Sequence, residues 1–159
     1  MRKKEAMVRT YIFAAIIIFM VGCSKTENGL VFGIPDYEKR DIAVSEVDLN
    51  ILIKANELLS TEDFWGKDIA SKCNDVTKLS LYCALEQASI SVMGKYVHRQ
   101  PALQEVRFAI DDLYRDRWEK HRLIDFNGNE NTTFKDVKNV IKKATETVES
   151  KIRITNSSS

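Results

Sequence analysis

Hydrophobic side chains recur with the period of an α-helix along most of the chain beyond Ser45. Over about 79–96 they fall at offsets of three, four, seven and eleven residues, which places them on one face of a helix. Pro101 suits the first turn of another helix, because that position needs no backbone N–H donor. The pattern predicts helical segments over about 45–59, 61–65, 79–96, 101–118 and 133–153.

Two of these helices begin at a capping sequence. Ser45 and Thr133 are each followed three residues later by an aspartate, which resembles a capping box. Apolar residues also alternate over 47–51, so a short strand is an alternative for the first turn of the first helix. Residues 121–129 end in a run of turn formers, and we expect a loop there.

These elements predict an all-α fold, an orthogonal bundle of about five helices in one small domain. We assign residues 45–153 to this helical domain and residues 154–159 to a disordered tail. Residues 23–44 contain turn formers followed by charges and are interpreted as a tether.

Residues 1–22 differ from the rest in composition. A basic stretch precedes an apolar run over 11–21, about half of the ~20 residues that a membrane-crossing helix needs. Gly22 and Cys23 follow at once, and the segment resembles a bacterial lipoprotein signal with its lipobox, commonly Leu-Ala-Gly-Cys, with Met20 in place of the leucine. The resemblance implies cleavage before Cys23 and a lipid on its thiol, which would hold the protein at a membrane. A non-cleaved anchor, or a plain signal peptide with an incidental cysteine, is the alternative.

The residue after the lipidated position bears on localisation. Ser24 stands where lipoproteins kept in the inner membrane commonly carry aspartate, so the resemblance implies the periplasmic side of the outer membrane in a Gram-negative cell and the cell surface otherwise. Without residues 1–22, 20 Lys and Arg face 22 Asp and Glu, a formal charge of −2. This balance gives no electrostatic footprint for nucleic acid.

The segment Leu81-Tyr82-Cys83-Ala84-Leu85 precedes by some forty residues the turn Leu123-Ile124-Asp125-Phe126-Asn127 and a threonine-capped helix. This order is similar to that of an uncharacterised family of small bacterial helical domains, over about residues 50–152. The resemblance implies a helical fold and no mechanism. The chain departs from the family pattern in Asp125 before the aromatic residue and Gly128 after the asparagine, which leaves the role of the turn open.

Cys83, with His98 or His121 as base and Asp125 as orienting acid, supplies the residue types of a thiol enzyme. A thiol within an apolar helix is usually inert packing, however, and an exported protein tends to oxidise spare thiols. Once Cys23 carries lipid, Cys73 and Cys83 remain, and this pair favours a disulfide.

The sequence does not predict a metal site. The oxygen-bearing side chains from Asp125 to Asn131 alternate as in a calcium loop, but Glu130 and Asp136 stand where the EF-hand pattern needs Gly and Glu. We interpret the segment as a turn that caps the last helix. His98 and His121 lack a further ligand at zinc spacing, and we expect no cofactor.

Arginines alternate with acidic residues between 99 and 122, which is typical of a solvated, mixed-charge face. The sharper alternative is a surface that recognises another protein, with Arg115 and Arg117 as candidate binding residues. The favoured function is therefore a lipid-anchored protein-binding module of the immunity, exclusion or envelope-interaction type. The alternative is an envelope hydrolase or transferase that uses Cys83 with His121 or His98.

Overall fold

Helices make up the described part of the chain, which in this computed structural model covers residues 38–67, 73 and 77–158, within a compact unit of Ile34–Ser159. There the structure contains five α-helices and no sheet, which confirms the predicted all-α bundle. The helices are α1 (Glu46–Leu58), α2 (Leu81–Met93), α3 (Pro101–Leu113), α4 (Arg122–Gly128) and α5 (Phe134–Ser157), with single 3-10 turns at Glu62–Phe64 and Arg115–Arg117. The proposed signal peptide 1–22, Cys23 and residues 24–37 of the tether lie outside the described residues.

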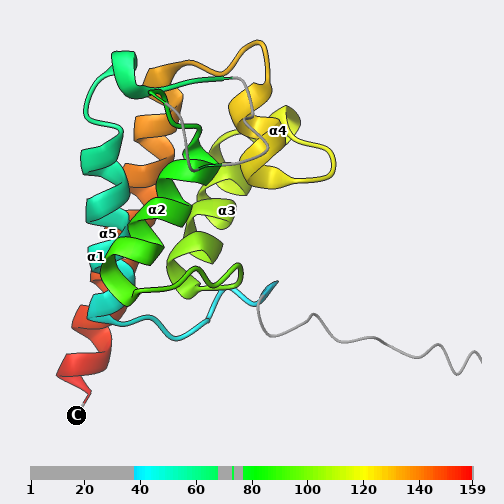
Figure 1. The fold of residues 1–159 in the computed structure, drawn as a ribbon. Helices are drawn as coiled ribbons and strands as arrows, with labels where there is room; N and C mark the ends of the chain where they lie inside the picture. The colour runs from blue at the N-terminus through cyan, green and yellow to red at the C-terminus, as the bar shows by residue number, and fades with distance from the viewer. Residues whose placement is uncertain (1–37, 68–72, 74–76, 159) are drawn as a thin grey trace, which may run out of the picture. The chain divides into compact units, whose positions relative to one another are not determined.

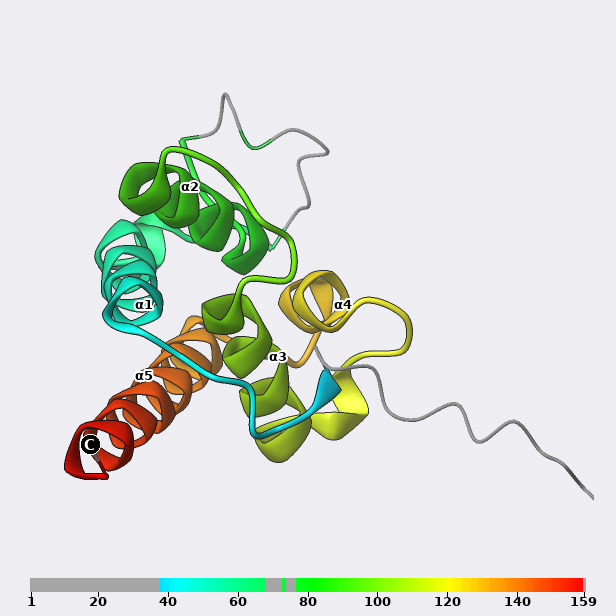
Figure 2. The same ribbon diagram turned by 90° about the horizontal axis from the view of Figure 1, so that it is seen from below.

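Helix α5 is about 36 Å long and runs along one side of the bundle (Figure 1). Helices α1 and α3 both pack against it, α2 packs on α1, and α4 contacts α2 and α3 (Figure 2). The face of α5 that carries Val137, Ile141, Ala144 and Val148 is buried in the core. Full burial of a valine or isoleucine side chain stabilises the fold by about 1.5–3 kcal/mol. Among the described helices, none is long and apolar enough to span a membrane.

Both predicted capping boxes are present. The Ser45 backbone N–H donates to Asp48 Oδ2 at 2.9 Å, and the Thr133 backbone N–H donates to Asp136 Oδ2 at 3.0 Å. Asp48 is buried, and its other oxygen accepts from the backbone N–H of Ala102 at 3.0 Å, which ties the start of α1 to the start of α3. Residues 47–51 are therefore helical, and the strand alternative is wrong.

Residues 121–129, expected to form a loop, contain α4. His121 Nδ1 accepts from the backbone N–H of Ile124 at 3.3 Å. Asp125 Oδ2 accepts from three successive backbone N–H groups just before the helix. Side chains therefore satisfy the backbone donors around the start of α4. Other boundaries also differ: α2 ends at Met93, before Gly94 with its positive φ of 74°, and α3 ends at Leu113. The predicted disordered tail is helical through Ser157.

Residues 38–44, which the sequence assigns to the tether, form a strap across α3 and α5 (Figure 2). Arg40 Nη2 lies 2.8 Å from Asp112 Oδ1 of α3, and Lys151 Nζ of α5 donates to the carbonyl of Arg40 at 2.6 Å. Glu38 accepts two hydrogen bonds of 3.0 Å from Arg122 on α4. These contacts attach the strap (residues 38–44) to α3, α4 and α5.

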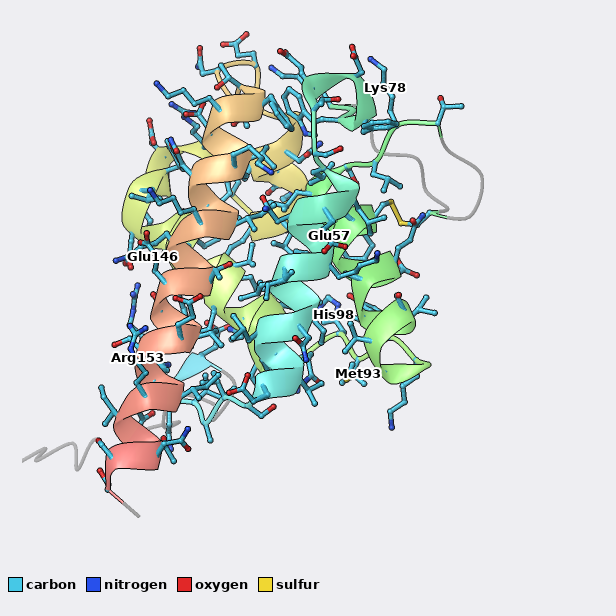
Figure 3. All side chains as sticks on the ribbon, turned by 90° about the vertical axis from the view of Figure 1, so that its left-hand side faces the viewer. Glu57, Lys78, Met93, His98, Glu146 and Arg153 are labelled. Atoms are coloured by element: carbon cyan, nitrogen blue, oxygen red, sulfur yellow. A yellow bond between two sulfur atoms is a disulfide. The ribbon has the colours of Figure 1, made fainter. Side chains whose placement is uncertain are left out.

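The predicted bridge between Cys73 and Cys83 is present, at the first turn of α2 (Figure 3). Close to it in sequence, Trp65 and Leu79 form an isolated parallel bridge that closes the segment between them. Bridging a loop of this length stabilises the fold by about 3 kcal/mol in the chain-entropy view. The segment between α1 and α2 is thus attached to the core at more than one point.

Candidate functional site: a cationic pocket beside α3 and α4

A cavity of about 290 Å³ opens where the strap, the loop before α3, α3 itself and the start of α4 meet. Four of its side chains are basic: Arg99, Arg107, Lys120 and Arg122. Glu38 is the acidic residue of the lining, and His98, His121, Gln104 and Trp118 complete it. We call this cavity the cationic pocket. It combines residues from four segments separated in sequence, so folding alone brings them together.

Arg107 is the buried cation of the pocket. Its side chain lies on α3 and is only 7% exposed. One nitrogen donates to Gln104 Oε1 at 2.9 Å and another to the carbonyl of His98 at 3.1 Å. Among the described residues, no carboxylate lies within ion-pair distance of this guanidinium. Burial lowers the pKa of Arg107 below its usual value, because the charged form has lost water without gaining a directly bonded anion.

Among the described residues, two buried donors of the pocket lack an acceptor. Gln104 is 1% exposed, and because its oxygen accepts from Arg107, its Nε2 is left without a partner. The indole nitrogen of Trp118 is likewise buried and unpaired. An unsatisfied buried polar group costs about 1–3 kcal/mol. Both donors therefore add a cost to the fold.

The two histidines lie side by side in the pocket, with ring centroids 6.0 Å apart. Tyr96 Oη lies 3.0 Å from His98 Nδ1, and His121 Nδ1 caps α4, so the proton of a neutral His121 sits on Nε2. Burial, then the positive charge of Arg107, lowers the pKa of both imidazoles below its usual value. Both rings are therefore mainly neutral at pH 7, which leaves the arginines and Lys120 as the source of positive charge.

The rim of the pocket carries stacked cations. The Arg115 guanidinium lies over the Trp118 ring at 4.5 Å, and that of Arg122 lies over the same ring at 4.9 Å. Arg122 is neutralised by Glu38 at 3.0 Å and Asp111 at 3.1 Å. Arg115, whose side chain is 69% exposed, has its nearest carboxylate, Asp111, at 3.5 Å. Arg115 and Trp118 thus present a solvent-facing cation held in place by an aromatic ring.

The residues of the predicted thiol enzyme do not form a catalytic group in the oxidised protein. The sulfur of Cys83 is bonded to Cys73, and the residue is only 1% exposed, so no thiolate is available for attack. Asp125 uses its carboxylate to cap α4. His98 and His121 do come together, but in the cationic pocket and with each other.

The Asp125–Asn131 segment is a structural junction. Asn127 is fully buried, and its Oδ1 accepts from Trp65 Nε1 at 2.8 Å and from the backbone N–H of Leu81 at 2.9 Å. Its Nδ2 donates to the carbonyls of Gly66 and Lys67. This side chain holds α4 against the start of α2. No cluster of three or more acidic, histidine or cysteine side chains suited to a metal occurs in the described part of the chain.

The two arginines predicted to bind a partner have different surroundings. Arg115 is exposed at the pocket rim, whereas the side chain of Arg117 is 22% exposed and pairs with Asp136 at 2.9 Å. The prediction of a solvated, mixed-charge face is wrong for Arg107, which is buried. Sequence reasoning missed Gln104 and Trp118 as pocket residues. A usable signal was the placement of Gln104 and Arg107 three residues apart beside the apolar stripe of α3.

Comparisons of this chain with protein-family models, with curated proteins and with solved structures found no match.

Proposed function

We propose that this protein is an exported, lipid-anchored recognition domain that binds another protein, of the immunity, exclusion or envelope-interaction type. The short apolar run that leads into Gly22-Cys23 supports export and lipid attachment at Cys23. The Cys73–Cys83 bridge fits an oxidising compartment such as the periplasm or the cell surface. In this proposal the lipid holds the protein at the membrane and the helical bundle supplies the binding surface.

The observation that carries the recognition role is the exposed Arg115 guanidinium stacked on Trp118 at the rim of the cationic pocket. Arginine and tryptophan are enriched among the few side chains that dominate the binding energy of protein interfaces. A cation held over an aromatic ring loses less side-chain entropy when a partner binds, because its position is largely fixed beforehand. The cationic pocket beside it favours a partner that presents acidic groups.

A reversal of charge at Arg115 tests this role. We expect Arg115→Glu to abolish capture of the partner by crosslinking and pull-down of the full-length protein from its own cells, because repulsion replaces attraction at the rim. Arg153→Glu is the matched control: the Arg153 side chain is 72% exposed and, like Arg115, faces an acidic residue four positions earlier. Arg153 projects from α5, as Figure 3 shows, and its variant should capture the partner normally.

Partner capture that survives Arg115→Glu, or that is lost equally in Arg153→Glu, contradicts the assignment of this surface. Arg117→Glu is unsuitable as a test because Arg117 pairs with Asp136 and its reversal would also destabilise the fold. The same cells test the anchor: Cys23→Ser should leave the membrane fraction or remain an uncleaved precursor. Normal processing with unchanged membrane attachment in Cys23→Ser would contradict lipidation at this residue.

A further inference from the structure

The lining of the cationic pocket combines two buried hydrogen-bond donors with a buried cation. Two donors, Gln104 Nε2 and Trp118 Nε1, belong to residues of its lining, are buried, and have no acceptor in the described part of the chain. Nearly all buried polar groups in proteins find a partner. Three buried side-chain atoms in the described part of the chain have none; two of them belong to the lining of this cavity, and the third is Thr132 Oγ1. Because both residues line this cavity, one acceptor group that reached both nitrogens would satisfy them.

The charge of the lining shows which kind of acceptor is needed. Arg107 is buried without a directly bonded carboxylate from the described residues, and Lys120 adds positive charge. The Glu38 carboxylate is already used, because it pairs with Arg122 at the rim. A neutral acceptor would satisfy the two free donors and leave Arg107 uncompensated. An anion would serve the donors and the buried charge together.

We propose that the cationic pocket binds an oxyanion, a phosphate or carboxylate group, with Arg107, Gln104 Nε2 and Trp118 Nε1 as its principal donors. The cavity of about 290 Å³ has room for such a group with a small substituent. His121 offers a further N–H, since its Nδ1 already accepts from Ile124 and its proton sits on Nε2. This site does not depend on the proposed protein partner, because the domain supplies every donor.

Thermal unfolding of the full-length protein in an uncharged detergent tests the site, with inorganic phosphate as the probe and sodium chloride at equal ionic strength as the reference. A ligand of the native state raises Tm, and we expect a rise of about 5–10 °C at a hundredfold excess over Kd. Sodium acetate at the same ionic strength shows whether a carboxylate binds as well.

Gln104→Glu is the decisive variant because it keeps the shape of the side chain and places a carboxylate next to Arg107, where Gln104 Oε1 now accepts at 2.9 Å. We expect this built-in anion to abolish the phosphate effect. Gln87→Glu makes the same chemical change on α2, outside the pocket lining, and should respond to phosphate as the native protein does. If Gln104→Glu fails to fold, Trp118→Phe removes one donor and should weaken phosphate binding about tenfold.

The proposal is overturned if neither phosphate nor acetate gives a larger response than chloride. It is also overturned if the native protein, Gln104→Glu and Trp118→Phe respond equally. Vesicles of phosphatidylcholine with and without phosphatidic acid distinguish a lipid headgroup from a soluble ligand as the source of the oxyanion. Any lipid anchor acts equally on both proteins, so a rise in Tm on phosphatidic acid that occurs in the native protein but not in Gln104→Glu identifies a lipid headgroup. A rise with free phosphate alone identifies a soluble ligand, and either result supports the site.

Discussion

Asn127 and Gln104 are both buried amide side chains, yet the domain uses them in opposite ways. Asn127 makes four hydrogen bonds, two through its oxygen and two through its nitrogen. Gln104 accepts through its oxygen from Arg107 and leaves its nitrogen unpaired. Both are at most 1% exposed, so solvent does not account for the difference.

The contrast separates a polar group that stabilises the fold from one that the fold leaves open. The Asn127 network is complete, and its bonds join segments that the apolar core alone would not hold in one register. The open donor of Gln104 costs about 1–3 kcal/mol and persists beside a second open donor and a buried cation. The pattern of satisfied and unsatisfied groups therefore points to the cationic pocket, and away from Asn127, as the place where a ligand binds.

The largest effect should follow from breaking the complete network. Asn127→Leu should lower the free energy of unfolding by about 3–5 kcal/mol, because Trp65 Nε1, the Leu81 backbone N–H and two carbonyl groups lose their partner in the interior. Urea unfolding measures the change. Asn139→Ala, an exposed asparagine on α5, is the control and should cost less than about 0.5 kcal/mol. A cost below about 1 kcal/mol for Asn127→Leu would contradict the conclusion that the Asn127 network stabilises the fold.

A smaller effect on stability should appear when the pH is lowered, and it arises from the two histidines of the cationic pocket. The pKa values of His98 and His121 are lowered by burial and by Arg107, so the unfolded chain binds protons more readily than the native state. Their contribution to stability is complete above about pH 6.5 and is lost as the pH falls below it. We expect the midpoint of denaturation to decrease as the pH is lowered from 7 to 5.

The double variant His98→Gln with His121→Asn should show a flatter profile over this range, because asparagine can still cap α4 and neither side chain titrates. Bound phosphate should also flatten the native profile, since an anion in the cationic pocket stabilises protonated histidine. A native profile that stays level from pH 7 to pH 5 would contradict the environment described for the two rings.

The smallest effect is expected at the open donor. Trp118→Phe, measured without phosphate, should change the free energy of unfolding by less than about 1 kcal/mol, because it removes an N–H that has no partner. Trp65→Phe deletes the same atom where it donates to Asn127 at 2.8 Å and should cost about 1–3 kcal/mol. Equal costs for the two substitutions, measured by urea unfolding, would show that the unpaired indole is not a feature of the protein in solution.

Much of the fold could be predicted because it depends on local signals. Apolar periodicity indicates α1, α2, α3 and α5, and the capping pairs at Ser45 and Thr133 mark two of their starts. The disulfide was predicted from the cysteine count together with the expectation of export. Helix α4 was missed because its start is capped by His121 and by Asp125, whose role depends on a loop that folds back to it.

The cationic pocket could not be predicted, because it consists of residues that meet only in three dimensions. Arg107 reads in the sequence like any arginine in a mixed-charge run, and nothing local shows that packing of the strap and α4 around α3 buries it. The same holds for Gln104 and Trp118, since an unpaired donor is defined by the absence of an acceptor in space. The thiol-enzyme interpretation made the opposite error and assembled a group from residue types alone.

The strap over residues 38–44 makes the length of extended chain upstream of the domain depend on the salt concentration. Its contacts with α3, α4 and α5 include the ion pairs of Glu38 and Arg40, which are partly exposed to solvent. The Debye length falls from about 8 Å at physiological ionic strength to about 3 Å at 1 M, so salt weakens such pairs while the apolar core is unaffected by screening. A released strap would add about 25 Å of extended chain between the domain and whatever holds its upstream end.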